Sequence, residues 1–70
     1  MKNQLSRNIV RYRKEKGLTQ EVLAQTLGVS FQAVSKWENA QALPDMTLLP
    51  KLSQGLEISI DKLLGYTFQD

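Results

Sequence analysis

A local pattern that marks the start of a helix occurs three times in this chain and restricts its fold more than any other feature. Each copy has an apolar residue, then Ser or Thr, then a second apolar residue four positions after the hydroxyl: Leu18-Thr19…Leu23, Val29-Ser30…Val34 and Ile58-Ser59…Leu63. At a helix N-cap the hydroxyl accepts a backbone N–H that lacks a helical partner, and the flanking apolar groups pack together. The pattern predicts helices over residues 20–27, 31–39 and 60–64, the last closed by Gly65.

A further helix is predicted at the amino end from the spacing of its apolar residues. Leu5, Ile9 and Tyr12 fall on one stripe of a helix over residues 3–16, and Gly17 ends it. Strands are not expected, because no stretch of the chain alternates apolar and polar residues strictly.

The fifth helix is predicted within residues 44–56, where Pro50 constrains its start. Proline lacks a backbone N–H and fits only in the first turn of a helix. We therefore expect Thr47 to cap the α-helix and Asp45 to cap a preliminary turn. The core face of this helix is expected to comprise Leu48, Leu49, Leu52 and Leu56.

The connection between the second and third predicted helices consists of Gly28, Val29 and Ser30 alone. So short a link with a glycine makes the two helices cross sharply, as in a helix-turn-helix. The sequence thus predicts an all-α, compact five-helix domain over residues 1–65. Residues 66–70 are expected to be a disordered tail or the start of a linker. Tyr66 and Phe68 leave open that this segment docks on the domain or pairs with a second subunit.

The absence of two residue types narrows the chemistry of which the chain is capable. Without His or Cys there is no imidazole base and no thiolate ligand, so we expect no enzyme, no metal site and no cofactor. The amino end lacks the apolar stretch of a signal peptide, and no window approaches the roughly 20 apolar residues of a membrane span. A cytoplasmic protein with no membrane partner is expected.

Charge is distributed unevenly along the chain. Residues 1–39 hold seven Lys or Arg against three Glu, a net charge of +4, whereas residues 40–70 carry a net charge of −2. This asymmetry favours a polyanion as the partner of the amino-terminal half, although a solvated surface explains a run of charge equally simply.

The predicted helix over residues 31–39 has two chemically different faces. At about 100° per residue, one arc holds small and apolar groups with one acid; these are Ala33, Val34, Trp37 and Glu38. Trp37 is therefore predicted to be a core residue. The opposite arc holds Phe31, Gln32, Ser35, Lys36 and Asn39.

Side chains of this outward arc suit the major groove of DNA, which admits one helix. Gln32 can pair with adenine, Lys36 can reach guanine or a phosphate, and Ser35 can serve either role. Phe31 can touch only apolar matter, for which the thymine methyl group is a suitable target. An ordinary solvated face is the alternative.

Glu38 lies at the edge of the inward arc and needs a partner, because an unpaired buried carboxylate is costly. Arg13, late in the first predicted helix, is the candidate for an ion pair.

The chain resembles the phage-repressor, Cro-like helix-turn-helix family, also called the XRE family, over roughly residues 9–64. The resemblance is carried by "GLTQ", the turn "LGVS", "AVSKWE" and the closing "ISIDKLL". It implies a lambda-repressor-like five-helix DNA-binding domain whose third helix lies in the major groove. The residues that it places nearest the base edges are Phe31, Gln32, Ser35 and Lys36. Those that it places at the phosphate backbone are Thr19, Gln20, Ser30 and Asn39. It also pairs Arg13 with Glu38.

Three positions depart from the family pattern besides Phe31, whose position is often polar. Ala40 stands where Gly is common, and Gln41 stands where Lys or Arg is common. Glu57 replaces the usual Gly after the fourth helix, which puts a left-handed residue without Gly there under strain. These changes are expected to affect affinity more than fold.

We expect a sequence-specific double-stranded DNA-binding domain of a bacterial or phage-type transcription regulator that binds its operator as a homodimer. The alternative is an antitoxin that binds an operator and a toxin protein, and a module that binds only protein is a third possibility. Because "LLGYTFQD" ends abruptly after the last predicted helix, a longer regulator with a C-terminal effector or oligomerisation domain is also left open.

Overall fold

The computed structural model describes residues 3–65, which form five α-helices and one short 3-10 turn, with no strand among them. The elements are α1 (Gln4–Glu15), α2 (Gln20–Leu27), α3 (Phe31–Glu38), η1 (Met46–Leu48), α4 (Leu49–Leu56) and α5 (Ile60–Leu64). The predicted all-α, five-helix fold class is confirmed.

The three predicted hydroxyl caps form as expected. Thr19 accepts the backbone N–H of Val22 at 3.1 Å, and Ser30 accepts that of Ala33 at 3.2 Å. Ser59 accepts the N–H of Lys62 at 3.1 Å. Because a cap of this kind contributes about 1 kcal/mol, the starts of α2, α3 and α5 are specified locally, and they coincide with the predicted starts.

The start of α4 differs from the prediction. Thr47 lies inside η1, and α4 begins after Leu48, with no side-chain cap. Asp45 explains the change, because its Oδ1 accepts both the backbone N–H of Thr47 at 3.0 Å and the Thr47 hydroxyl at 3.1 Å. The hydroxyl is thereby used within the preliminary turn that Asp45 was expected to cap. Pro50 lies in the first turn of α4, as expected.

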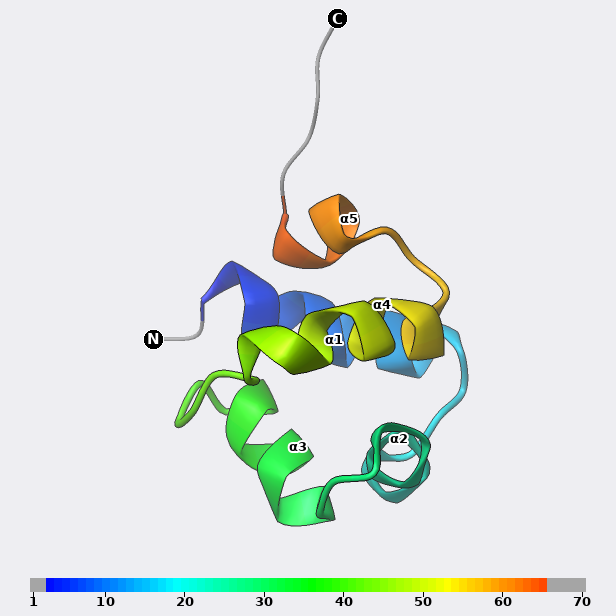
Figure 1. Ribbon diagram of the computed structural model, residues 1–70, viewed down its shortest axis with the longest axis vertical. Helices are drawn as coiled ribbons and strands as arrows, with labels where there is room; N and C mark the ends of the chain where they lie inside the picture. Colours follow the sequence, from blue (N-terminus) through cyan, green and yellow to red (C-terminus); the bar gives the residue numbers. More distant parts are fainter. Residues whose placement is uncertain (1–2, 66–70) are drawn as a thin grey trace, which may run out of the picture.

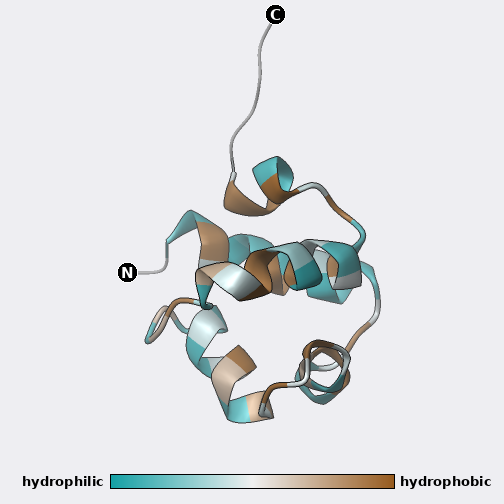
Figure 2. Ribbon diagram, in the orientation of Figure 1, coloured by the Kyte–Doolittle hydropathy of each residue, from teal (hydrophilic) through white to brown (hydrophobic). Residues whose placement is uncertain are grey.

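One continuous core joins all five α-helices. Its buried apolar residues are Ile9, Tyr12, Leu23, Ala24, Leu27, Val34, Trp37, Leu52, Leu56 and Leu63. Leu48 and Leu49, predicted on the core face, are only half-buried against this cluster, as is Leu5 of the amino-terminal stripe. Figure 2 shows apolar and hydrophilic segments alternating along the helices, which is the pattern of amphipathic helices around a shared core.

The helices are arranged so that α2 and α3 occupy one end of the molecule and α5 the other (Figure 1). Helices α1 and α4 lie between these ends, and α1 contacts both α3 and α5. A buried Asn8 on α1 donates its Nδ2 to the carbonyl oxygens of Lys62 at 3.2 Å and Leu63 at 2.9 Å. This amide holds the short α5 against α1.

Among residues 3–65, two non-glycine residues adopt left-handed backbone conformations where helices end. Ala40, after α3, has φ 59°, and Glu57, after α4, has φ 57°. Each carries local strain because a residue with a Cβ adopts a positive φ at a steric cost, and both are positions where the resemblance implies glycine. Glu57 also pairs with Lys16 across the surface.

None of the helices among the described residues is long and apolar enough to cross a membrane. Within residues 3–65 there is also no group of three or more acidic, His or Cys side chains placed to hold a metal ion. The expectations for Tyr66, Phe68 and the rest of residues 66–70 lie outside the described residues.

Candidate nucleic-acid interface

Helix α3 presents a polar face outward and an apolar face to the core, as the sequence predicts. Trp37 and Val34 are buried, with exposed fractions of 5% and 0%. The outward residues Phe31, Gln32, Lys36 and Asn39 are exposed, and Ser35 is half-buried between the two faces. Four of the five outward side chains are thus available to a partner along the length of the helix.

The turn between α2 and α3 fixes the angle at which α3 is presented. Gly28 ends α2 with φ 73°, a left-handed conformation that glycine adopts without a steric penalty. The next N–H, that of Val29, bonds the carbonyl of Ala24 at 3.0 Å, which closes the end of α2. The side chain of Val29 is half-buried against the core, so the turn is fixed both by this hydrogen bond and by packing.

Glu38 forms a buried polar centre that joins three segments of the chain. Its Oε2 accepts Arg13 Nε at 2.6 Å, and its Oε1 accepts Arg13 Nη2 at 3.1 Å. The same Oε1 also accepts Gln20 Nε2 at 2.9 Å. Glu38 is only 5% exposed, and Arg13 further donates Nη1 to the carbonyl of Leu18 at 2.7 Å. The end of α3 is therefore tied to α1 and to the start of α2.

The part played by Gln20 in this centre was not foreseen from the sequence, which pairs Glu38 with Arg13 alone. A carboxylate has about four acceptor positions, and one Arg fills only part of them. That surplus was the available signal, but it does not say which donor fills it. Gln20 is half-buried, and its amide nitrogen carries a second N–H besides the one that Glu38 accepts.

The four residues expected at a phosphate backbone lie at helix ends. Thr19 and Gln20 stand at the start of α2, Ser30 at the start of α3 and Asn39 at its end. The Thr19 and Ser30 hydroxyl oxygens accept N–H groups of their own helices, which leaves each hydroxyl hydrogen available to donate. Helix N-termini suit anions because their first N–H groups lack helical partners.

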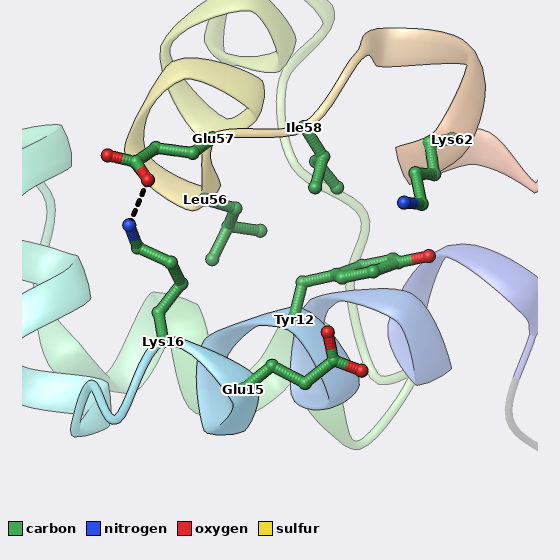
Figure 3. Close-up of a pocket in the computed structure, with 7 residues that line it drawn as sticks. All are labelled: Tyr12, Glu15, Lys16, Leu56, Glu57, Ile58 and Lys62. Carbon is green, nitrogen blue, oxygen red and sulfur yellow. Dashed lines mark hydrogen bonds and ion pairs between the residues drawn. The ribbon is translucent and has the colours of Figure 1, made fainter.

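A polar depression lies elsewhere, between α1, the end of α4 and α5 (Figure 3). The Tyr12 ring forms one wall with Lys62 Nζ 5.4 Å from its centroid, and the Lys16–Glu57 pair bridges the opposite side. Nearby on α1, a hydrogen bond to Glu15 raises the pKa of Arg11. Within the depression Lys16 pairs with Glu57, whereas Glu15 bonds Arg11 outside it, and α2 and α3 contribute no lining residue.

The helix-turn-helix family HTH_3 matches residues 9–63 of the chain. The chain belongs to this family. The resemblance to phage-repressor, Cro-like proteins is thereby confirmed.

Curated relatives of this helix-turn-helix chain include a transcriptional activator and a phage-derived transcriptional repressor. It is 45% identical over 53 residues to the HTH-type transcriptional activator BcrR of Enterococcus faecalis, covering 76% of this chain and 26% of BcrR. It is 36% identical over 61 residues to the cryptic phage CTXphi transcriptional repressor RstR of Vibrio cholerae, covering 87% of this chain and 54% of RstR. The helix-turn-helix chain thus spans between a quarter and about half of the length of these relatives.

Solved helix-turn-helix structures share the fold over nearly the whole chain. The P22 c2 repressor in complex with synthetic operator 9T matches with a TM-score of 0.85 and 32% identity, covering 93% of this chain and 98% of that one. SinR, the master regulator for biofilm formation, solved in complex with DNA, matches with a TM-score of 0.79 and 34% identity, covering 86% and 97%.

Proposed function

We propose that this helix-turn-helix domain binds double-stranded DNA sequence-specifically and regulates transcription by occupying an operator. The observation that carries the proposal is the division of α3, which buries Trp37 and Val34 and exposes Gln32 and Lys36. A helix anchored on one face with hydrogen-bonding side chains on the other fits the major groove. The likeness to the P22 c2 repressor solved with an operator, and to the regulator SinR solved with DNA, supports this interpretation.

In the proposed complex the outward face of α3 reads bases. Gln32 pairs with adenine, and Lys36 reaches guanine acceptors or a phosphate oxygen. Ser35 is half-buried and contributes its hydroxyl from the edge of this face, whereas Phe31 meets an apolar group. Catalysis and a cofactor are not needed, since occupancy of the operator is the whole effect.

Phosphate contacts fix the register of the proposed complex. Gln20 donates one amide N–H to Glu38 and directs its second N–H to a phosphate. Thr19 and Ser30 add hydroxyl donors at the starts of α2 and α3, and Asn39 adds an amide at the end of α3. These contacts carry no sequence information but orient α3.

The proposed active species is a homodimer on a palindromic operator in the cytoplasm, where a bacterial or phage operator lies. Dimers of this motif bind half-sites about 34 Å apart. The relatives and structures described above are named as a transcriptional activator, repressors and a master regulator, which favours a regulator over an antitoxin.

Selection of bound sequences from a random duplex pool, at a stated salt concentration, tests the proposal. We expect enrichment of a palindrome with two half-sites, and binding of the enriched duplex that weakens steeply as salt is raised. A pool that is not enriched, or binding that salt does not weaken, would contradict DNA recognition and leave a protein-interaction module.

A further inference from the structure

Phe31 is an aromatic side chain that the fold of residues 3–65 leaves outside its core. Its exposed fraction is 45%, and it belongs neither to the buried cluster nor to the half-buried apolar residues packed against that cluster. It is the first residue of α3 and shares the outward face with Gln32 and Lys36. Folding therefore does not account for an aromatic residue at this position.

The location of Phe31 separates it from the other exposed large apolar side chains of the described segment. Those lie on α2, in the connection after α3, in η1 and on α5: Val22, Leu43, Met46 and Ile60. Phe31 alone among them is on the helix that is proposed to read bases.

We propose that Phe31 reads the 5-methyl group of a pyrimidine, so that DNA binding responds to the presence of that methyl. This inference rests on the proposed function of α3. In the major groove the base edges present hydrogen-bond donors and acceptors, and the apolar group among them is the C5-methyl of thymine. A phenyl ring has no donor or acceptor, so facing a polar edge leaves that edge without its water.

A consequence follows for modified DNA. 5-Methylcytosine carries its methyl group at the same ring position as thymine and keeps the hydrogen-bonding groups of cytosine. A residue that recognises only the methyl group does not distinguish its two sources. Methylation of a cytosine at the position facing Phe31 is therefore expected to strengthen binding relative to unmodified cytosine.

The test uses the duplex selected from the random pool, with each thymine replaced in turn by deoxyuridine, which removes only the methyl group. We expect one position per half-site at which the change weakens binding by about fourfold, the loss of one buried methyl-sized group. Phe31→Ala should bind the thymine and deoxyuridine duplexes equally. At the same position, 5-methylcytosine in place of cytosine should strengthen binding by the wild-type protein about fourfold and leave Phe31→Ala unaffected.

Ile60→Ala is the matched control, because Ile60 is also the first residue of a helix after a serine cap and is 38% exposed. It lies on α5, away from α3 (Figure 1), and should keep the full thymine-to-deoxyuridine ratio. Phe31→Leu keeps an apolar side chain and should keep part of it.

Equal binding of thymine and deoxyuridine duplexes by the wild-type protein at every position would overturn the inference alone. It would assign Phe31 to a sugar contact or to stacking between bases, neither of which depends on the methyl group. If Phe31→Ala kept the full thymine-to-deoxyuridine ratio of the wild-type protein, the inference would be overturned as well. If the wild-type protein bound no duplex at all, the proposed function would be overturned together with the inference.

Discussion

At the scale of single residues, Glu38 has the largest structural role of any charged side chain described. It accepts three hydrogen bonds, two from Arg13 and one from Gln20, while almost fully removed from water. A buried pair of this kind contributes little beyond what an apolar pair would, but breaking it strands a buried charge. Glu38 therefore links the stability of the domain to the position of Gln20.

Glu38→Ala is expected to lower the free energy of unfolding by about 3–5 kcal/mol, because Arg13 is left buried without a counter-charge. Urea unfolding followed by circular dichroism measures the change. Glu15→Ala is the matched control, since Glu15 also bonds an Arg but at an exposed site, and it should leave stability nearly unchanged. An unaltered midpoint for Glu38→Ala would show that the pair is not buried in solution.

Gln32 and Gln20 have different expected roles in binding. Gln32→Ala should remove a base contact, costing about 1–3 kcal/mol on the selected duplex and relaxing preference at one base position. Gln20→Ala should weaken binding to selected and random duplexes alike, because it removes a phosphate contact. Fluorescence anisotropy with both duplexes separates the cases. If Gln32→Ala weakened both duplexes equally, its assignment to a base would be wrong.

At the scale of elements, the residues that follow α3 determine where that helix ends. The end of α3 is closed by two N–H groups bonding the carbonyl of Lys36, from Gln41 at 2.8 Å and from Ala42 at 3.3 Å. That closure requires the left-handed conformation at Ala40, which glycine adopts more easily than alanine. The strained residue lies at the carboxyl end of the helix that is proposed to read bases.

Ala40→Gly should raise the free energy of unfolding by up to about 1 kcal/mol, since removing the Cβ relieves the left-handed strain and outweighs the added freedom of the unfolded chain. The same substitution at Ala42, whose φ is not positive, should instead destabilise the domain. Thermal melting of both variants measures the difference. A Gly at position 40 that destabilised as much as one at position 42 would argue against strain at Ala40.

At the scale of the whole molecule, the surface proposed to bind DNA lies at one end, and the short helix α5 lies at the other. Helices α2 and α3 form the end that is proposed to meet DNA, and α5 closes the other end through the hydrogen bonds of Asn8. One small domain has few phosphate contacts, so a single copy is expected to bind weakly. Two copies on one operator combine their contacts.

The stoichiometry on DNA is the corresponding prediction. Two chains are expected per palindromic duplex, and one chain, much more weakly bound, per duplex carrying a single half-site. Sedimentation velocity with a labelled duplex, over a range of salt concentrations, measures both. A single chain bound as tightly to one half-site as to the palindrome would rule out the proposed homodimer.

The sequence by itself determined the local features of this protein. The starts of α2, α3 and α5 follow from hydroxyl caps three residues away from the N–H groups that they accept, and the two faces of α3 follow from helical periodicity. Contacts so close in sequence need no knowledge of the rest of the fold.

Only the tertiary structure decided the partners that are distant in sequence. Gln20 meets Glu38 from 18 residues away, and Asn8 meets Leu63 from 55 residues away. Thr47 is a local exception: the hydroxyl bonds the Asp45 carboxylate two residues away, and the residue pattern did not rank this contact against a cap of α4. A residue pattern shows that a buried polar group needs a partner, but packing decides which donor comes within about 3 Å of it.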